Sequence, residues 1–431
     1  SAAAGSGKTA VLVERIKRLI GEEKVPLEEM LVVTFTNAAA SEMREKIVSA
    51  LPDQMAQIHK AHISTFHAFA LDVIRRYFHL IKLEPGFKIC DETQRVLLQT
   101  KAMDQLFHAK FVKEDQDFLH FLKLYATGKS DEPVKEMIQE THSFIQSLPD
   151  PFSWLNERVK DLKKNEEEFK AGPVYQEILG NIEEELVSAL AGCNRVIDLL
   201  EDAGVKSLLS KARTDLDMIH YIKTCFLQDF DEGQSAVQEA RFQIFTAAKI
   251  DKGNYETVRE DIKLLRDGVK ENIKNIALQY CIKPLDEYLK ELNDIHKEAK
   301  ILFRLVQEFD ELYRQQKEKF GIIDFSDIEH YALEILSNQE AAHEYQNKFR
   351  YIFIDEYQDS NLVQECLIEK IRRNNNVFMV GDVKQSIYKF RLAEPEIFIK
   401  KYNTYKEGIN PFDLKIDLNR NFRSKGNIIS I

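Results

Sequence analysis

A glycine-rich run near the start of the sequence contains the residue types that bind phosphate. Residues 2–9 read Ala-Ala-Ala-Gly-Ser-Gly-Lys-Thr, which fits the phosphate-loop pattern except that Ala2 replaces its first glycine. Small residues let backbone N–H groups wrap around phosphate oxygens, the lysine adds charge at the β- and γ-phosphates, and the threonine hydroxyl can bind Mg²⁺. The alternative, a chance glycine-rich turn, is disfavoured by the amphipathic pattern that follows at once. The predicted nucleotide-binding residues are Ala4, Gly5, Ser6, Gly7, Lys8 and Thr9, with Thr9 also a metal ligand.

An acidic pair follows an apolar run much later in the chain. Tyr351–Phe353 lead into Ile354, Asp355 and Glu356. A carboxylate at the end of a buried strand lies where ligands bind in open α/β sheets. We therefore expect Asp355 to hold Mg²⁺ and Glu356 to act as a base toward water. Taken alone, this segment could also be a solvated acidic turn; together with the phosphate loop it favours nucleotide hydrolysis.

A third cluster follows another apolar run. Gln385 carries an amide that could sense a γ-phosphate or its attacking water, and residues 388–391 read Tyr-Lys-Phe-Arg. Aromatic faces stack on bases and cations meet the backbone of single-stranded nucleic acid, so this mixture suits such a ligand. The alternative is that Tyr388 and Phe390 are core residues, which is common for isolated aromatic side chains.

Short continuous apolar runs and helical patterns must position these clusters. The predicted buried parallel strands are Met30–Thr36, Tyr351–Asp355 and Val377–Gly381, and a fourth run, Phe412–Leu418, alternates and is predicted to be half-exposed. Helical patterns occupy Ala10–Ile20, Ala38–Ile47 and His67–Phe78. The two ends of the chain therefore indicate an α/β fold.

The middle of the chain has a different pattern. From about Asp91 to Phe320 the sequence is charged, amphipathic and poor in glycine, with no convincing strand. Predicted helical segments include Val159–Phe169, Val258–Tyr288 and Leu285–Lys319. We therefore expect a large all-α domain inserted between two halves of the parallel sheet.

Composition limits the possible classes of protein. The chain has 431 residues, 60 Lys+Arg against 71 Asp+Glu, and a net charge of −11, which excludes a polybasic nucleic-acid binder but not a locally basic groove. Five scattered cysteines without a CxxC pair indicate free thiols in a reducing compartment. No signal peptide or membrane-spanning run is visible, so we expect no membrane association. The phosphate loop lacks a preceding strand, and we expect the chain to be a piece of a longer protein.

Six motifs in order resemble those of superfamily 1A helicases, the group of the UvrD, Rep and RecB motors. They are GSGKT, TFTNAAA (34–40), STFHAF (64–69), DEYQD, GDVKQSIYKFR and NRNFRS (419–424). Within the group, GIIDFSDIEHYAL (321–333), DEYQDSNLVQE and VKQSIYKFRLAEPEIF resemble the larger, helicase-bearing member of AddAB-type helicase–nucleases. The resemblance implies a bacterial cytoplasmic, ATP- and Mg²⁺-dependent 3′→5′ DNA motor. It also implies a fused nuclease beyond this chain, a role in double-strand break resection for recombinational repair, and a second, AddB-like subunit.

The resemblance also implies domains and residue roles. It divides the chain into a first RecA-like motor lobe (1–100 and 315–405), the inserted helical domain (101–314) and the start of a second lobe (406–431). Gln385 and Arg423 would reach the γ-phosphate, and Phe422 would stack on adenine. The DNA track would be lined by Phe35, Asn37, Thr65, His67, Tyr388, Phe390 and Arg391.

Several points stay open at the level of sequence. Phe390 stands where simpler relatives have Trp; His67 could be a buried imidazole instead; Phe325 and Asp327 could support the DNA site or only cap a helix. The adenine-reading glutamine, the later motifs with the second γ-phosphate arginine, and the nuclease cluster are absent. We therefore expect the isolated chain to be inactive. The alternatives are a stand-alone UvrD/Rep-type repair helicase and an ATP-gated DNA-binding module. A phosphotransferase would leave NRNFRS and KQSIYKFR without a role.

Overall fold

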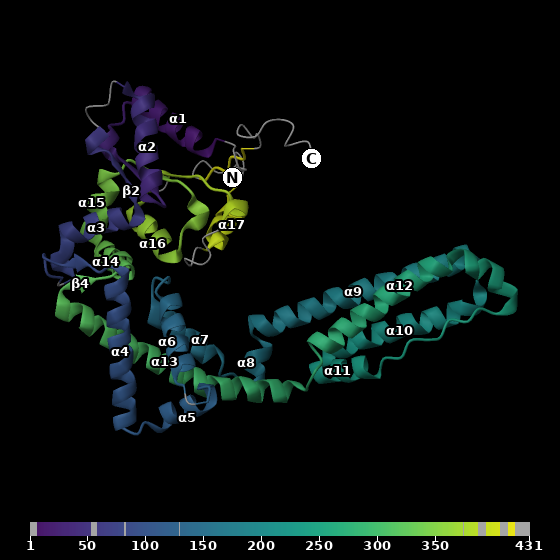
Figure 1. The fold of residues 1–431 in the computed structure, drawn as a ribbon. Coiled ribbons are helices and arrows are strands. Elements are labelled where there is room, and N and C mark those ends of the chain that lie inside the picture. Colours follow the sequence, from purple (N-terminus) through teal and green to yellow (C-terminus); the bar gives the residue numbers. More distant parts are fainter. Residues whose placement is uncertain are drawn as a thin grey trace. The chain divides into compact units, whose positions relative to one another are not determined.

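The computed structural model describes residues 7–52, 58–81, 83–128, 130–373, 375–386, 394–405 and 413–418. The chain forms two compact units. Unit 1 comprises Ser1–Glu157 and Ile301–Ile431, and unit 2 comprises Arg158–Lys300 (Figure 1). Among the described residues, no helix is long and apolar enough to cross a membrane.

A four-stranded parallel sheet forms the centre of unit 1. Its strand order is β2 (His62–Thr65), β1 (Met30–Thr34), β5 (Tyr351–Ile354) and β6 (Val377–Met379). The register pairs Val33 with Ser64 on one side and with Ile354 on the other, and β6 continues the same parallel arrangement. The carboxyl ends of all four strands therefore meet at one edge.

Helices cover both faces of this sheet. Alternate residues of β1 enter different cores, with Met30 and Val32 in one and Leu31 and Val33 in the other, as the two-residue period of a strand requires. The first face is covered by α1 (Lys8–Gly21) and α2 (Asn37–Ala50). The second face is covered by α3 (Phe66–Tyr77), α14 (Phe325–Leu336), α15 (Gln339–Lys348) and α16 (Leu362–Ile371). The three-layer arrangement confirms the predicted α/β fold.

The three predicted buried strands occur at the expected places, but their ends and the burial of the last one differ from the prediction. β1 ends at Thr34 because the side chain of Thr36 already accepts the N–H of Ala39 and caps α2. β6 is half-buried rather than buried, since it is the last strand of the described sheet. Within 413–418 only the single bridge positions Leu414 and Leu418 occur, so the described part of the predicted fourth run forms no strand. The short β2 was missed.

Unit 1 also contains a helical part with its own core. It is built from α4 (Glu92–Val112), α5 (Gln116–Tyr125), α6 (Glu132–Ile145) and residues 301–320 of α13 (Leu285–Phe320). A second, two-stranded parallel sheet joins β3 (Lys88–Ile89) to β4 (Ile322–Ile323). Further elements of unit 1 are α17 (Pro395–Thr404) and the 3-10 turns η1 (Leu27–Glu29) and η3 (Phe78–Leu80), while α7 (Pro151–Asp161) crosses the boundary between the units.

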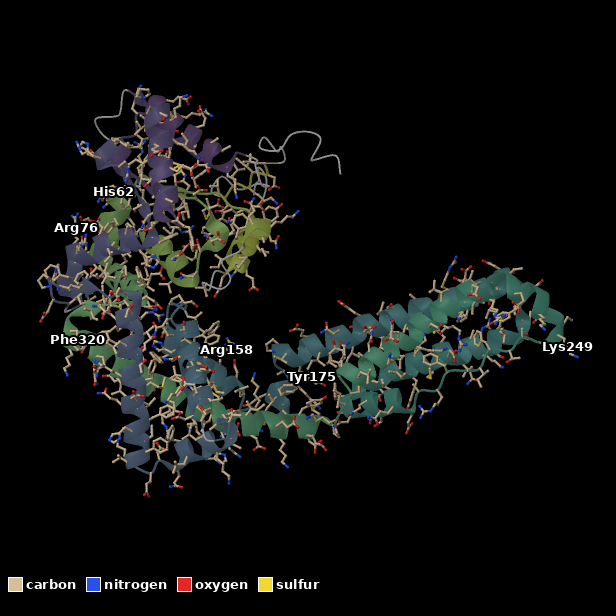
Figure 2. The ribbon with its side chains drawn as sticks, viewed as in Figure 1. His62, Arg76, Arg158, Tyr175, Lys249 and Phe320 are labelled. Carbon is tan, nitrogen blue, oxygen red and sulfur yellow. The ribbon has the colours of Figure 1, made fainter. Side chains whose placement is uncertain are left out.

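Unit 2 is a helical bundle. It contains α8 (Glu166–Lys170), α9 (Pro173–Asp202), α10 (Lys206–Gln228), α11 (Phe230–Glu239), η4 (Lys249–Asp251) and α12 (Lys252–Gln279). Its side chains, with Tyr175 and Lys249 labelled, are drawn in Figure 2. The described residues of the middle segment form no strand, as predicted. Two predicted helices are interrupted: Asn165 begins α8 with a capping box, and α12 ends at Gln279 ahead of Pro284.

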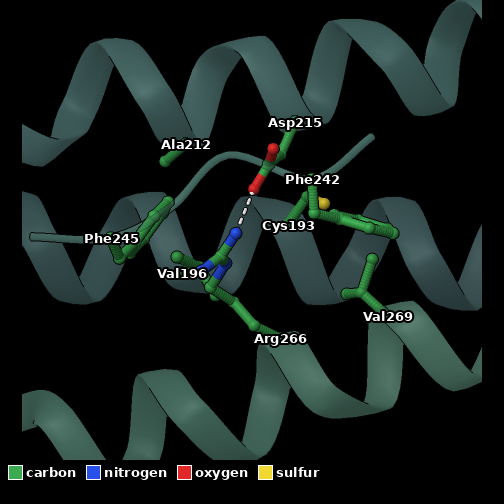
Figure 3. A pocket seen from close by; sticks show the side chains of 8 residues that line it. All are labelled: Cys193, Val196, Ala212, Asp215, Phe242, Phe245, Arg266 and Val269. Atoms are coloured by element: carbon green, nitrogen blue, oxygen red, sulfur yellow. Dashed lines mark hydrogen bonds and ion pairs between the residues drawn. The ribbon is translucent and has the colours of Figure 1, made fainter. Parts of the chain in front are cut away.

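A buried ion pair fixes the segment that connects α11 to α12. Arg266 lies 2.7 Å from the Oδ2 of Asp215, and it also donates to the carbonyl of Gln243. The other oxygen of Asp215 accepts the N–H of Gln243, and the guanidinium lies 3.6 Å from the centre of the Phe245 ring. A small cavity beside this pair is lined by Cys193, Val196, Ala212, Asp215, Phe242, Phe245, Arg266 and Val269 (Figure 3). Arg266 and Asp215 satisfy each other and the backbone, so the pair links α10 and α12 to the segment at Gln243.

Candidate functional site

The carboxyl edge of the parallel sheet brings the predicted site residues together. The four loops that follow β1, β2, β5 and β6 leave the sheet at this edge. The segment after β1 carries Phe35 and Asn37, and the start of α3 after β2 carries His67. The loop after β5 carries Asp355 and Glu356, and Gln385 follows β6. Ligands bind outside the carboxyl ends of strands in open α/β sheets. The fold therefore places residues from four distant segments at the position where a ligand is expected.

The first turn of α1 has features of an anion-binding site. Gly7 adopts the left-handed conformation, with φ of 82°, which glycine reaches without strain, and no side chain caps the helix in the described part of the chain. The first N–H groups of an uncapped helix can bind a phosphate. Lys8, the first residue of α1, is buried at 8% exposure, and Thr9 follows it half-buried.

The ammonium group of Lys8 joins α1 to two other loops. Its Nζ lies 3.2 Å from the Oε2 of Glu356 and 3.4 Å from the Oε1 of Gln385. These partners follow β5 and β6, and they are 348 and 377 positions away in the sequence. The structure therefore brings three of the predicted nucleotide-site residues into direct contact.

Asp355 and Glu356 differ in burial. Asp355 is buried, its N–H donates to the carbonyl of Val33 on β1, and its Oδ1 accepts the N–H of Glu356 at 3.0 Å. Burial, and then the neighbouring charge of Glu356, raise the pKa of Asp355. Glu356 is half-exposed, and its backbone has the left-handed conformation, with φ of 51° and ψ of 44°. This conformation costs a residue other than glycine about 1–3 kcal/mol.

A buried glutamine in the same loop was missed by sequence reasoning. Gln358 belongs to the turn η5 (Tyr357–Asp359) and contacts Glu356, Asp359 and the backbone of Asp382. Asp382 begins the turn η6 (Val383–Gln385), and its Oδ2 accepts the amide of Gln385 at 2.5 Å. The glutamine of DEYQD was a signal, because a polar side chain close to a buried strand needs hydrogen-bond partners.

Three residues predicted to line the DNA track lie at the ends of β1 and β2. Phe35 is half-buried directly after β1, and Asn37 is exposed as the first residue of α2. Thr65 is buried, and its hydroxyl accepts the N–H of Ala68 at 3.3 Å as the N-cap of α3. Thr65 therefore has a structural role in the described conformation, while Phe35 and Asn37 are accessible from the edge.

His67 is neither buried nor isolated. Its side chain is 39% exposed, and its Nε2 lies 3.5 Å from the Oε1 of Glu329. The ring meets Phe325 edge-to-face at 5.4 Å between centroids, and Phe325 is 56% exposed. Buried Glu329 also accepts from Asn361 and Gln364, which follow the DEYQD loop. The expected alternative of a buried imidazole is wrong, and Phe325 forms an accessible aromatic surface with His67.

Asp327 caps a helix, which was the structural alternative for the DFSD segment (324–327). Asp324 is the N-cap of α14, and the pair Asp324–Asp327 forms a complete capping box. Buried Lys317 lies 3.1 Å from Asp324 and 2.6 Å from Asp327. Phe325 and Asp327 therefore do different things: the aromatic side chain faces outward and the carboxylate fixes the helix start.

Some predicted site residues lie outside the described part of the chain. These are Ala4, Gly5, Ser6, Tyr388, Phe390, Arg391, Phe422 and Arg423. Their assignments to nucleotide and DNA stay predictions.

Comparisons with known proteins find similar sequences along the whole chain. Residues 1–406 match the UvrD/REP helicase N-terminal domain. The whole chain aligns with proteins named as one of the subunits of an ATP-dependent helicase/nuclease, at 39% identity in Alkaliphilus metalliredigens, 38% in Alkaliphilus oremlandii and 36% in Bacillus velezensis. The chain spans about 37% of the length of each of these relatives.

Proposed function

Because the chain belongs to the UvrD/REP helicase N-terminal domain family, we propose that it is the nucleotide-binding part of an ATP-driven DNA helicase. The observation that carries the proposal is the contact of Lys8 with both Glu356 and Gln385 at the carboxyl edge of the sheet. A phosphate-loop lysine, a carboxylate base and an amide sensor are the groups that hydrolysis of a γ-phosphate needs.

The chemistry follows from the positions of these groups. Lys8 would move from Glu356 to the β- and γ-phosphates, and the uncapped start of α1 would bind the phosphate oxygens. Half-exposed Glu356 is free to take a proton from the attacking water once Lys8 has left it. Gln385 would contact the γ-phosphate or that water.

The carboxylate of Asp355 fits the expected metal site. No hydrogen bond among the described residues reaches its Oδ2, while its Oδ1 is held by the N–H of Glu356. Asp355 and Thr9 would hold Mg²⁺, which supplies positive charge to the phosphate oxygens when it is bound. Carboxylate and hydroxyl oxygens are the ligands that Mg²⁺ prefers.

DNA would bind along the other half of the same edge. Phe35 and Asn37 follow β1, and His67 with Phe325 lies at β2, whereas the nucleotide residues follow β5 and β6. Exposed aromatic side chains can stack on unpaired bases. The proposal includes 3′→5′ movement on single-stranded DNA, with Tyr388, Phe390 and Arg391 as further contacts.

The relatives' names extend the proposal to a larger assembly. Each is named as one subunit of a helicase/nuclease. We infer by this likeness a fused nuclease, a role in resecting double-strand breaks, and an AddB-like partner subunit. Arg423 and Phe422 would act on the nucleotide from a second lobe. Residues 406–431 are only the start of that proposed lobe, so Arg423 should be poorly positioned in residues 1–431 alone. Residues 1–431 should then hydrolyse ATP far more slowly than the full-length protein, since such an arginine is worth roughly 10³–10⁵ in rate in related enzymes.

Steady-state ATP hydrolysis by the full-length protein, with and without single-stranded DNA, tests this function. We expect strong stimulation by DNA in the wild type and none in Lys8→Ala, with circular dichroism confirming that the variant is folded. Duplexes with 3′ or 5′ single-stranded tails test the direction, and only the 3′-tailed duplex should be unwound. ATP binding without DNA-stimulated turnover would indicate an ATP-gated binding module instead.

A further inference from the structure

The amide of Gln358 is fully used by its neighbours. Gln358 is 1% exposed, and its Nε2 donates to the Oε2 of Glu356 at 2.8 Å and to the Oδ2 of Asp359 at 3.1 Å. Its Oε1 accepts the N–H of Asp382 at 2.9 Å. Both amide hydrogens and the amide oxygen therefore have partners, which fixes the orientation of this side chain.

A glycine on the next loop makes room for that amide. A Cβ added to Gly381 would lie 2.7 Å from the Oε1 of Gln358 and 3.1 Å from the Cε2 of Phe398. Atoms at the first distance overlap, so a larger residue would push the amide away. The loops after β5 and β6 thus approach each other closely at Gln358, and the approach depends on Gly381.

Gln358 also completes a closed ring of polar contacts. Lys8 contacts the Oε2 of Glu356, which accepts from Gln358. Gln358 accepts from the backbone of Asp382, whose carboxylate accepts from Gln385. Gln385 returns to Lys8 through its Oε1 at 3.4 Å. The ring passes through the phosphate-loop lysine, the expected base and the expected phosphate sensor.

Nucleotide binding would break this ring of contacts between Lys8 and Glu356. The side chains that act on the Glu356 carboxylate in the described structure include cationic Lys8, acidic Asp355 and Asp359, and neutral Gln358. Phosphate oxygens would compete for Lys8, which would then leave Glu356. In the described structure the Gln358 amide is the remaining donor side chain to this carboxylate.

We propose that Gln358 is a positioning residue that holds the Glu356 carboxylate in place and links it to the loop that carries Gln385. This inference rests on the proposed function, because it assigns Glu356 as the base. Gln358 reaches the reaction only through Glu356 and Asp382. Its loss should therefore lower kcat and leave KM for ATP nearly unchanged.

The first test replaces the amide by an apolar chain of similar length. In the full-length protein, Gln358→Met should lower kcat of DNA-stimulated ATP hydrolysis by about 10- to 100-fold, the range for misplacing a catalytic group. Gln234→Met is the matched control, since Gln234 is a buried glutamine of unit 2 that donates to the carbonyl of Cys281. The control should lose stability without losing kcat.

Two further variants separate positioning from folding. Gln358→Glu keeps the shape and the oxygen that accepts from Asp382, but adds a negative charge beside Glu356 and Asp359. The ionised carboxylate cannot donate to Glu356, so kcat should fall while KM for ATP is retained. Gly381→Ala displaces the same amide from the other loop and should lower kcat in the same way with KM retained.

The outcomes distinguish this inference from the proposed function. No DNA-stimulated hydrolysis by the wild type would overturn both. A wild-type protein that is active, with unchanged kcat in both Gln358→Met and Gln358→Glu, would overturn the positioning role alone. If Gln358→Met fails to fold, kcat and KM for ATP of Gln358→Glu and of Gly381→Ala decide.

Discussion

Two polar pairs in this protein have similar chemistry and different surroundings. In unit 2, Arg266 and Asp215 lie 2.7 Å apart, with side chains 12% and 5% exposed, and both also bond to the backbone of Gln243. At the sheet edge of unit 1, Lys8 and Glu356 lie 3.2 Å apart, and the Glu356 side chain is 40% exposed. In the first pair, both Asp215 oxygens and the Arg266 guanidinium have hydrogen-bond partners. The second has a partly open carboxylate beside an uncapped helix start, so a ligand can replace one partner.

The difference suggests how to tell a structural ion pair from a functional one. A saturated buried pair contributes to the fold, and removing one partner leaves an uncompensated charge. An open pair at the carboxyl edge of a parallel sheet contributes to chemistry, and removing one partner changes reaction rates. The following predictions test this contrast, from the largest expected effect to the smallest.

Glu356→Gln in the full-length protein should lower kcat for ATP hydrolysis by about 10²–10⁴-fold, the contribution of a positioned general base. The amide keeps the shape of the side chain, so nucleotide binding and the melting temperature should change little. Single-turnover hydrolysis together with binding of a fluorescent ATP analogue measures both. Hydrolysis near the wild-type rate would show that another group is the base.

Arg266→Met should lower the free energy of unfolding by about 3–5 kcal/mol, because buried Asp215 loses its charged partner. Denaturant titration monitored by circular dichroism measures this change. The double variant Asp215→Leu with Arg266→Met should recover part of the loss, since no buried charge remains at this pair. If Arg266→Met instead lowered kcat of the folded protein and left stability intact, the contrast between the two pairs would be wrong.

Phe325→Ala should weaken binding of single-stranded DNA by about 1–3 kcal/mol, the range for losing one base stack. Phe325 is 56% exposed, so the fold should tolerate the change. Fluorescence anisotropy with a labelled oligonucleotide gives the affinity, and ATP affinity without DNA serves as the internal control. The exposed residue Phe320 offers a matched variant, Phe320→Ala, which should bind DNA as the wild type does. Equal affinity in both variants would remove Phe325 from the DNA track.

The sequence predicted the sheet edge well because its signals are local. A buried strand followed by Asp355 and Glu356, and a glycine-rich run before Lys8, each fit within a few residues. Their meeting point could also be predicted, since parallel strands share one carboxyl edge. The boundaries of β1, α8 and α12 were predicted less well because capping side chains and Pro284 decide them.

Other features depend on contacts between distant residues and could not be predicted. The sequence marks Gln358 as a polar residue near a buried strand, but its partner Asp382 is identified only once the loop after β6 is placed against it, with Gly381 leaving the space. The Arg266–Asp215 pair joins two helices whose amphipathic patterns say nothing about which charges are buried. The His67 imidazole has its charged partner in Glu329, which lies far along the chain on α14.

Asp359 gives the smallest expected effect, a change in the pH dependence of stability. It is buried beside Glu356, and burial followed by the Glu356 charge raises its pKa to about 6. An acid whose pKa is higher in the folded state binds a proton more tightly there, so it adds stability as the pH falls through about 6. Asp359→Asn removes this group and keeps its shape. We expect the melting temperature of the variant to gain less than that of the wild type between about pH 7 and pH 5, measured in buffers of equal ionic strength. Asp131→Asn is the control, because Asp131 is a half-exposed carboxylate that precedes α6 in the helical part of unit 1. An identical pH dependence in wild type and Asp359→Asn would show that Asp359 stays ionised in the fold.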